Sequence, residues 1–145
     1  MTNGLSEWRL ERAMDTFNDG EQLLAIGSNQ GAINRFYYAA FYAVRALLAL
    51  NKLDSPKHSG VMSLFNKEFV KTQIISKESS KTFTNVFALR AQADYEDFKI
   101  FSTEEAKKVR DSVRELIKEI STVINKEHLT TPEFNLEQSK DEQEL

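Results

Sequence analysis

The stretch RFYYAAFYAVRALLAL, residues 35–50, decides the fold class of this chain. It holds five aromatic residues, two arginines and no acid. On a helix that turns 100° per residue, its apolar side chains spread around nearly the full circumference, whereas four polar or aromatic ones gather within about 80°. These four are Arg35, Tyr38, Tyr42 and Arg45. The stretch therefore predicts a central helix with one polar-aromatic edge.

Two explanations of this edge stay open. Alanines let neighbouring helices approach closely, and a tyrosine can bury its ring while its hydroxyl keeps a hydrogen-bond partner, so the edge fits a core helix. Alternatively, Arg35, Tyr38, Tyr42 and Arg45 face a subunit interface or a cleft for a nucleotide. Guanidinium groups bind phosphate and aromatic rings stack on bases, as such a cleft requires.

Helical periodicity continues along the chain, and the alternation typical of strands is absent. We expect helices over residues 5–26, 29–50 and 61–70, one from 79 or 80 to 98, and a last one ending near 127. The last helix begins at a capping box, Ser102 with Glu105 three positions later. Gly20, inside the first helix, is expected to cost about 1 kcal/mol relative to alanine. The pattern predicts an all-α, up-and-down bundle of four principal helices plus one short helix.

The 145 residues suit one domain, which we place at 1–128, followed by a mobile tail at 129–145. The tail carries a charge of −4, so the remainder is nearly neutral at +1. Such a domain lacks the strong basic footprint of proteins that bind nucleic acid by charge alone. No apolar run approaches the roughly 20 residues of a membrane span, and no secretory signal is visible, so we expect a cytoplasmic protein without membrane contact.

The second signal is ALRAQADYEDF, residues 88–98. Arg90 falls on the apolar face of its helix, where an unpaired charge is expensive, so Asp94 one turn later is the natural partner. This pair either orients the helix internally or holds Arg90 at a cleft between two subunits, where it neutralises a phosphate. Tyr95 meets such a ligand only if the helix ends or bends there.

Four short motifs in order carry a resemblance to a known family: NRFYYAAFYAVRALL, PKHSGVMSLF, LRAQADYEDF and STEEA. Together they resemble HEPN domains, especially the subgroup with a YYA helix, a lysine-histidine-glycine turn and an R-x-x-A-D-Y helix. The resemblance covers about residues 5–125. It implies a dimeric helical bundle and, in many members, metal-independent ribonuclease activity in toxins or defence effectors paired with a minimal nucleotidyltransferase.

In those ribonucleases an arginine is followed after four to six residues by a histidine, and both subunits contribute to one cleft. The resemblance places Arg90 at the arginine position, but Tyr95 stands where the histidine would be. A phenol with a pKa near 10 is a poor base at neutral pH, although it can donate a proton or orient a phosphate. His58 is the other candidate: it either caps or hydrogen-bonds the short helix, or points at the cleft of Arg90 and replaces the missing imidazole.

The sequence leaves three hypotheses for the function, and the missing histidine favours the first. In the first hypothesis, the protein is a dimeric RNA- or nucleotide-binding, regulatory component of a toxin-antitoxin or defence system with a nucleotidyltransferase-type partner. The second is a metal-independent ribonuclease toxin that uses Arg90 with Tyr95 or His58, and the third is a structural interaction module. With two histidines far apart and no cysteine, the sequence predicts neither a metal site nor a cofactor.

Overall fold

The computed structural model describes residues 4–96 and 99–130, with side chains as far as residue 127. Within these ranges the chain is helical, without a β-strand. The elements are α1 (Gly4–Ala25), α2 (Asn29–Leu50), α3 (His58–Phe65), the π-helical turn η1 (Asn66–Val70), α4 (Lys77–Tyr95) and α5 (Thr103–Thr130). The predicted all-α fold is confirmed.

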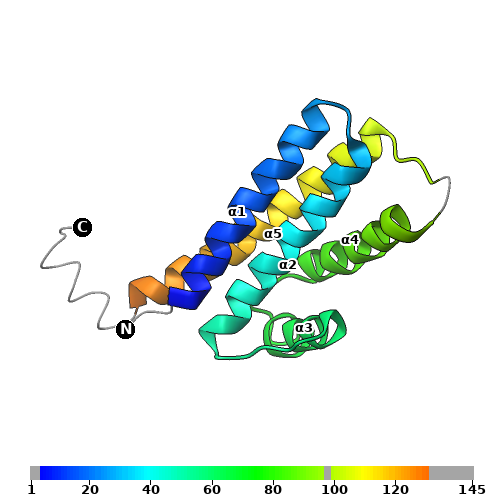
Figure 1. Cartoon of the computed structure of the whole chain (residues 1–145). Helices are drawn as coiled ribbons and strands as arrows, with labels where there is room; N and C mark the ends of the chain where they lie inside the picture. The colour runs from blue at the N-terminus through cyan, green and yellow to red at the C-terminus, as the bar shows by residue number, and fades with distance from the viewer. Residues whose placement is uncertain (1–3, 97–98, 131–145) are drawn as a thin grey trace, which may run out of the picture.

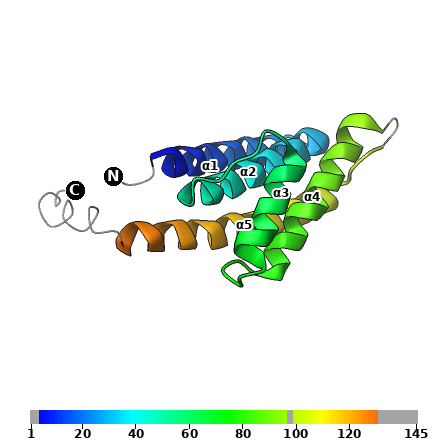
Figure 2. The same cartoon turned by 90° about the horizontal axis from the view of Figure 1, so that it is seen from below.

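Three long helices, α1, α2 and α5, lie side by side, and α2 and α5 run opposite to α1 (Figure 1). The pair formed by α3 and α4 crosses these helices at one side of the bundle (Figure 2). The predicted central position of α2 is confirmed, because this helix packs against α1, α3, α4 and α5. Its edge toward α3 and α4 is where the candidate site lies.

Small residues let α1 and α2 approach closely. The hydroxyl of Ser6 donates a hydrogen bond to the carbonyl oxygen of Ala46 at 2.7 Å, across the seam between these helices. A Cβ atom at Gly20 would lie 2.6 Å from Cε1 of Phe36, whose ring is fully buried. Gly20, which the sequence marks as a weak point of the helix, therefore makes room for a core ring.

Helix boundaries follow the caps. The hydroxyl of Ser76 accepts a hydrogen bond from the backbone N–H of Ser79 at 3.1 Å, so α4 begins at Lys77, two or three residues earlier than expected. The predicted capping box of α5 is confirmed: Ser102 N–H donates to the Glu105 carboxylate at 2.8 Å, and Glu105 N–H donates to the Ser102 hydroxyl at 3.0 Å.

Three predicted helix boundaries differ from those in the structure. The short helix begins at His58 and not at residue 61, and it changes to π-helical geometry at Asn66. The fourth helix ends at Tyr95 and not at 98, and residue 98 lies outside the described part of the chain. The last helix continues to Thr130. The expected tail lies almost entirely outside the described residues, so its mobility stays a prediction.

None of the helices in the described ranges is both long enough and apolar enough to span a bilayer.

Candidate functional site

Arg90 lies on α4, under the aromatic edge of α2. Its guanidinium carbon is 5.0 Å from the ring centre of Tyr37, 5.6 Å from that of Tyr38 and 5.8 Å from that of Phe87. Its Nη1 donates a hydrogen bond to Oδ2 of Asp94 at 3.0 Å, so the ion pair expected from the sequence is present. The side chain is 11% exposed. Rings and one carboxylate therefore hold this cation in a single position.

The C-terminal end of α4 is hydrogen-bonded to the N-terminal part of α2 by residues that follow Arg90 in the sequence. The amide nitrogen of Gln30 donates to the carbonyl oxygen of Ala93, and Nδ2 of Asn34 lies 3.5 Å from Oδ1 of Asp94. Burial is the largest single effect and disfavours the charge on Arg90, but the hydrogen bond to Asp94, together with the electrostatic effects of Tyr38, Asp94 and Tyr37, outweighs it, so the pKa of Arg90 is raised. Arg90 therefore stays a cation at every pH of biological interest.

His58, the first residue of α3, points at the same aromatic cluster. Its ring stacks on Phe41 with centres 4.4 Å apart, and its Nδ1 lies 2.5 Å from the hydroxyl of Tyr37. It also meets Tyr38 and Phe87, with ring centres 6.4 Å and 6.1 Å away. The sequence left open whether His58 faces the surroundings of Arg90. In the structure both side chains contact the same three rings: Tyr37, Tyr38 and Phe87.

The protonation states of this cluster follow from burial and charge. Burial, followed by the charges of Arg90 and Arg45, lowers the pKa of His58, so its imidazole is neutral at neutral pH. Burial raises the pKa of Tyr37 strongly, although Arg90 opposes this, so the phenol keeps its proton. The neighbours of the cation are thus a neutral phenol and a neutral imidazole.

The hydrogen-bond network then indicates the tautomer of His58. Within the described residues, Nδ1 of His58 is the partner recorded for the Tyr37 hydroxyl. Because Nδ1 of His58 is the acceptor available to the buried phenol proton among the described residues, we assign the phenol as the donor and place the imidazole proton on Nε2. In this state His58 offers an incoming ligand an N–H donor, and its lone pair is already engaged.

Tyr37 is the main member of the cluster that the sequence analysis missed. It is fully buried and stacks on Phe83 with ring centres 6.3 Å apart. A tyrosine on the apolar arc of a helix needs a buried partner for its hydroxyl, and this requirement could have indicated Tyr37 beforehand. The identity of that partner, His58, depends on how α3 returns to α2.

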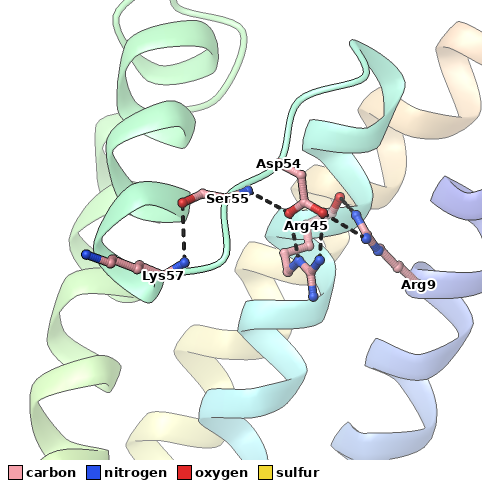
Figure 3. A network of polar contacts seen from close by, with 5 residues as sticks. All are labelled: Arg9, Arg45, Asp54, Ser55 and Lys57. Carbon is pink, nitrogen blue, oxygen red and sulfur yellow. Dashed lines mark hydrogen bonds and ion pairs between the residues drawn. The ribbon is translucent and has the colours of Figure 1, made fainter.

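The edge of α2 is half-buried and belongs partly to the cluster. Tyr38 and Tyr42 have ring centres 6.4 Å apart. The Arg35 guanidinium carbon lies 5.2 Å from the Tyr38 ring centre, and Arg12 of α1 lies 5.3 Å from that of Tyr42. Each tyrosine of the edge is therefore faced by an arginine. Arg45, at the other end, pairs with Asp54 at 2.8 Å, and the two belong to the polar network of Figure 3.

Tyr95 lies apart from these side chains. It is the last residue of α4, and it is 78% exposed. The rings recorded over Arg90 in the described part of the chain come from Tyr37, Tyr38 and Phe87. Although the helix does end at Tyr95, the structure does not bring its phenol into the cluster.

Acidic residues make one groove of the described surface a poor site for an anion, whereas another groove is lined by Lys67 and Lys71. A groove of about 670 Å³ between α4 and α5 is lined by Glu78, Asp111, Glu115 and Glu119, and this negative charge repels phosphate. Among the residues described, no three histidine, cysteine or acidic side chains are grouped so that they could hold a metal ion. The cluster of Arg90 and His58 is therefore a better candidate for a phosphate-containing ligand than the acidic groove.

Comparison with known proteins assigns the family. The model of the HEPN domain matches residues 6–124. The chain belongs to the HEPN domain family. This HEPN domain is 42% identical over 100 residues to a UPF0332 protein of Thermotoga maritima, across 69% of this chain and 75% of the relative. It is 25% identical over 120 residues to a UPF0332 protein of Archaeoglobus fulgidus, across 83% of this chain and 95% of the relative.

A third relative has a name that refers to function. It is "Putative toxin MJ0142" of Methanocaldococcus jannaschii, 34% identical over 87 residues, across 60% of this chain and 59% of the relative. The family and the helical bundle expected from the four sequence motifs are thus confirmed.

Proposed function

We propose that this HEPN domain binds RNA or a nucleotide as the dimeric, regulatory component of a toxin-antitoxin or defence system, with a nucleotidyltransferase-type partner. The observation that carries the proposal is that Arg90 and His58 contact the same three rings. The relative named as a toxin supports the biological setting.

The chemistry of the cluster favours binding a phosphate. Phosphate oxygens only accept hydrogen bonds, and a fixed guanidinium is a strong, charge-assisted donor to them. With its proton on Nε2, neutral His58 adds a second donor. The half-buried rings of Tyr38 and Tyr42, each faced by an arginine, are aromatic groups beside which a base can stack. A nucleotide thus finds a cation, a neutral donor and aromatic faces on one side of the bundle.

Ribonuclease activity is the second candidate, and one observation favours it. The lowered pKa of His58 keeps an imidazole neutral beside the Arg90 cation, as a base that deprotonates a 2′-hydroxyl must be. The attack of that hydroxyl on the adjacent phosphate would form a 2′,3′-cyclic phosphate and release a 5′-hydroxyl. However, the hydroxyl of Tyr37 occupies Nδ1, and Tyr95 points to solvent. We therefore rank binding above cleavage.

The test measures binding and cleavage of a labelled single-stranded RNA in the presence of a chelator. The variants are Arg90→Gln and His58→Gln, and Arg110→Gln is the matched control, because Arg110 also pairs with a carboxylate, Asp111, at 2.9 Å. We expect Arg90→Gln to weaken binding by about tenfold or more and His58→Gln by a smaller factor, with the RNA intact. The control should bind like the wild type.

Three outcomes would contradict the proposal: no RNA or nucleotide binding by the wild type, equal binding by wild type and Arg90→Gln, or cleavage. Cleavage that both variants abolish would establish the ribonuclease. The dimer is tested separately by sedimentation, which should give about twice the 16.6 kDa of one chain. A mass of one chain at the concentrations used for binding would remove the dimer from the proposal.

A further inference from the structure

The segment between α2 and α3 brings the chain back sharply before it reaches His58. After α2, Lys52 adopts a positive φ of 58°. The N–H of Lys52 donates to the carbonyl of Ala49 at 3.1 Å, and the N–H of Leu53 donates to that of Leu48 at 3.0 Å. These two hydrogen bonds form a Schellman motif, which ends many α-helices. Asp54 follows at once, beside the flank of α2.

The carboxylate of Asp54 joins three parts of the chain (Figure 3). It accepts hydrogen bonds from Nη2 of Arg45 on α2 at 2.8 Å and from Nη2 of Arg9 on α1 at 3.2 Å. The backbone N–H of Ser55 donates to the same carboxylate at 2.8 Å. The hydrogen bond from Arg45 leads the effects that hold the pKa of Asp54 at about 2. The carboxylate is thus charged throughout the pH range in which proteins work.

The next residues connect this anchor to the first turn of α3. The Ser55 hydroxyl accepts the N–H of Lys57 at 3.3 Å, as Figure 3 also shows. A Cβ at Gly60 would lie 2.0 Å from Oγ of Ser55, so this side chain packs directly against α3. Pro56 between them has a fixed φ. Few freely rotating bonds therefore separate the Asp54 carboxylate from the backbone of His58.

Arg45 links the Asp54 carboxylate to the His58 imidazole by a second route, through Phe41. Its guanidinium carbon lies 5.7 Å from the ring centre of Phe41, the ring on which His58 stacks at 4.4 Å. The side chains of Arg45 and Asp54 are 26% and 46% exposed. An isolated ion pair open to solvent contributes little to stability, but this one belongs to a network in which the Arg9 side chain is only 12% exposed, so the network also stabilises the contact between α1 and α2. The location of Asp54, four residues before His58, also suits local positioning.

We propose that Asp54 is a positioning residue of the candidate site: held by Arg9 and Arg45, it fixes the start of α3 so that the His58 imidazole lies on Phe41 and at the Tyr37 hydroxyl. The relevance of this position to a ligand rests on the proposed function. The position itself does not, and it can be measured without any ligand.

The first test reads the position of the imidazole by NMR. The sequence has two histidines, so a His58→Gln variant identifies the signals of His58. Stacking on Phe41 should shift its ring protons upfield in the wild type. In Asp54→Asn we expect these protons to move toward the values of a free histidine. Asp111→Asn is the matched control, because Asp111 also pairs with two arginines, Arg110 and Arg114, and it should leave the His58 signals unchanged.

Two further variants distinguish a local movement of His58 from a general loss of structure. Arg9→Gln leaves the linker sequence intact and should shift the His58 signals part of the way, and Asp54→Glu should restore much of the wild-type shift. Circular dichroism should show a folded protein in each case. If Asp54→Asn and Arg9→Gln are folded and keep the full upfield shift, the positioning role is wrong.

The RNA assay separates this inference from the proposed function. If the wild type binds RNA, Asp54→Asn should lower its affinity by the same factor as His58→Gln, and combining the two changes should add nothing further. Full affinity in Asp54→Asn, or additive losses in the combination, would overturn the positioning role. If the wild type does not bind RNA, the proposed function fails, and the NMR shifts alone still decide whether Asp54 places His58.

Discussion

Two regions of the bundle are built in different ways. The seam of α1, α2 and α5 is filled mainly by alanines, aliphatic side chains and the rings of Phe17 and Phe36. The region between α2, α3 and α4 is filled by rings and charged or polar groups that need partners, such as Arg90, His58 and Tyr37. The stability of the first region depends mainly on volume and burial, with few buried polar groups such as Ser6. The second has a defined arrangement only when each polar group meets its partner, and this is what a binding site requires.

The largest expected effect belongs to the first region. Leu116 of α5 is fully buried, so Leu116→Ala should lower the free energy of unfolding by about 2–5 kcal/mol through lost burial and a residual cavity. Lys118→Ala, at a side chain that is 70% exposed, is the control and should change it by less than about 0.5 kcal/mol. Urea unfolding measures both. Equal effects would mean that α5 is not packed as described.

Gly20→Ala sharpens the comparison within α1. Although alanine favours helices, its Cβ would lie 2.6 Å from the buried ring of Phe36. We expect a net loss of about 1–3 kcal/mol from overpacking. Asn18→Ala, at an exposed position of the same helix, should be neutral or slightly stabilising. A Gly20→Ala protein that melts higher than the wild type would show that the seam is not tight.

In the second region, Tyr37→Phe removes one hydroxyl without changing the ring. It should cost about 1 kcal/mol, since Nδ1 of His58 loses its donor while the half-buried imidazole can still reach water. Tyr42→Phe, on the half-buried edge of the same helix, should change the stability by less than about 0.5 kcal/mol. Indistinguishable melting curves for the two variants would contradict the assigned role of the Tyr37 hydroxyl.

The pH dependence separates the two regions again, because the buried side chains described for the first region include no titrating group. The pKa of His58 is lowered below its ordinary value of 6.5, so the unfolded chain takes up a proton first as the pH falls. Stability should therefore be independent of His58 above about pH 7.5 and decrease as the pH falls toward 5.5. His58→Gln should flatten this part of the profile of melting temperature against pH. If the wild type and His58→Gln gave parallel profiles of melting temperature against pH, His58 would not be the source of the pH dependence.

The smallest effect is expected at the turn that leads from α2 toward the site. Lys52 has a φ of 58°, a conformation that glycine adopts without strain. Lys52→Gly should therefore raise the melting temperature slightly, by the equivalent of about 0.5 kcal/mol. A clear loss of stability would indicate that the lysine side chain has a role of its own. Lys67→Gly, at an exposed helical position, is the control and should destabilise.

The difference between the two regions explains which features could be predicted from the sequence. Periodicity and caps predicted the helices of the first region to within a few residues, because volume and burial repeat every three or four positions. The Arg90 and Asp94 pair was also predictable, since both lie on one helix four residues apart. The contact of His58 with Tyr37 was not, because residues 21 positions apart meet through the geometry of the linker.

Two features, one in the linker and one at the end of α4, could not be predicted from the pattern of residues. Asp54 is one of 22 acids in the sequence, and only the folded chain places it between Arg9 and Arg45. Tyr95 was proposed from its place in a motif, but the helix end leaves it in solvent. Side chains that act through partners distant in sequence are therefore where a single sequence is least informative.

We expect Arg90 and His58 to bind one ligand together, and a double-mutant cycle measures their coupling. The affinity for a single-stranded RNA is measured for wild type, Arg90→Gln, His58→Gln and the double variant, each confirmed to be folded. The account predicts non-additive losses, with a coupling energy between about 0.5 and 3 kcal/mol. Losses that simply add, or single variants that bind like the wild type, would show that the two side chains do not form one site.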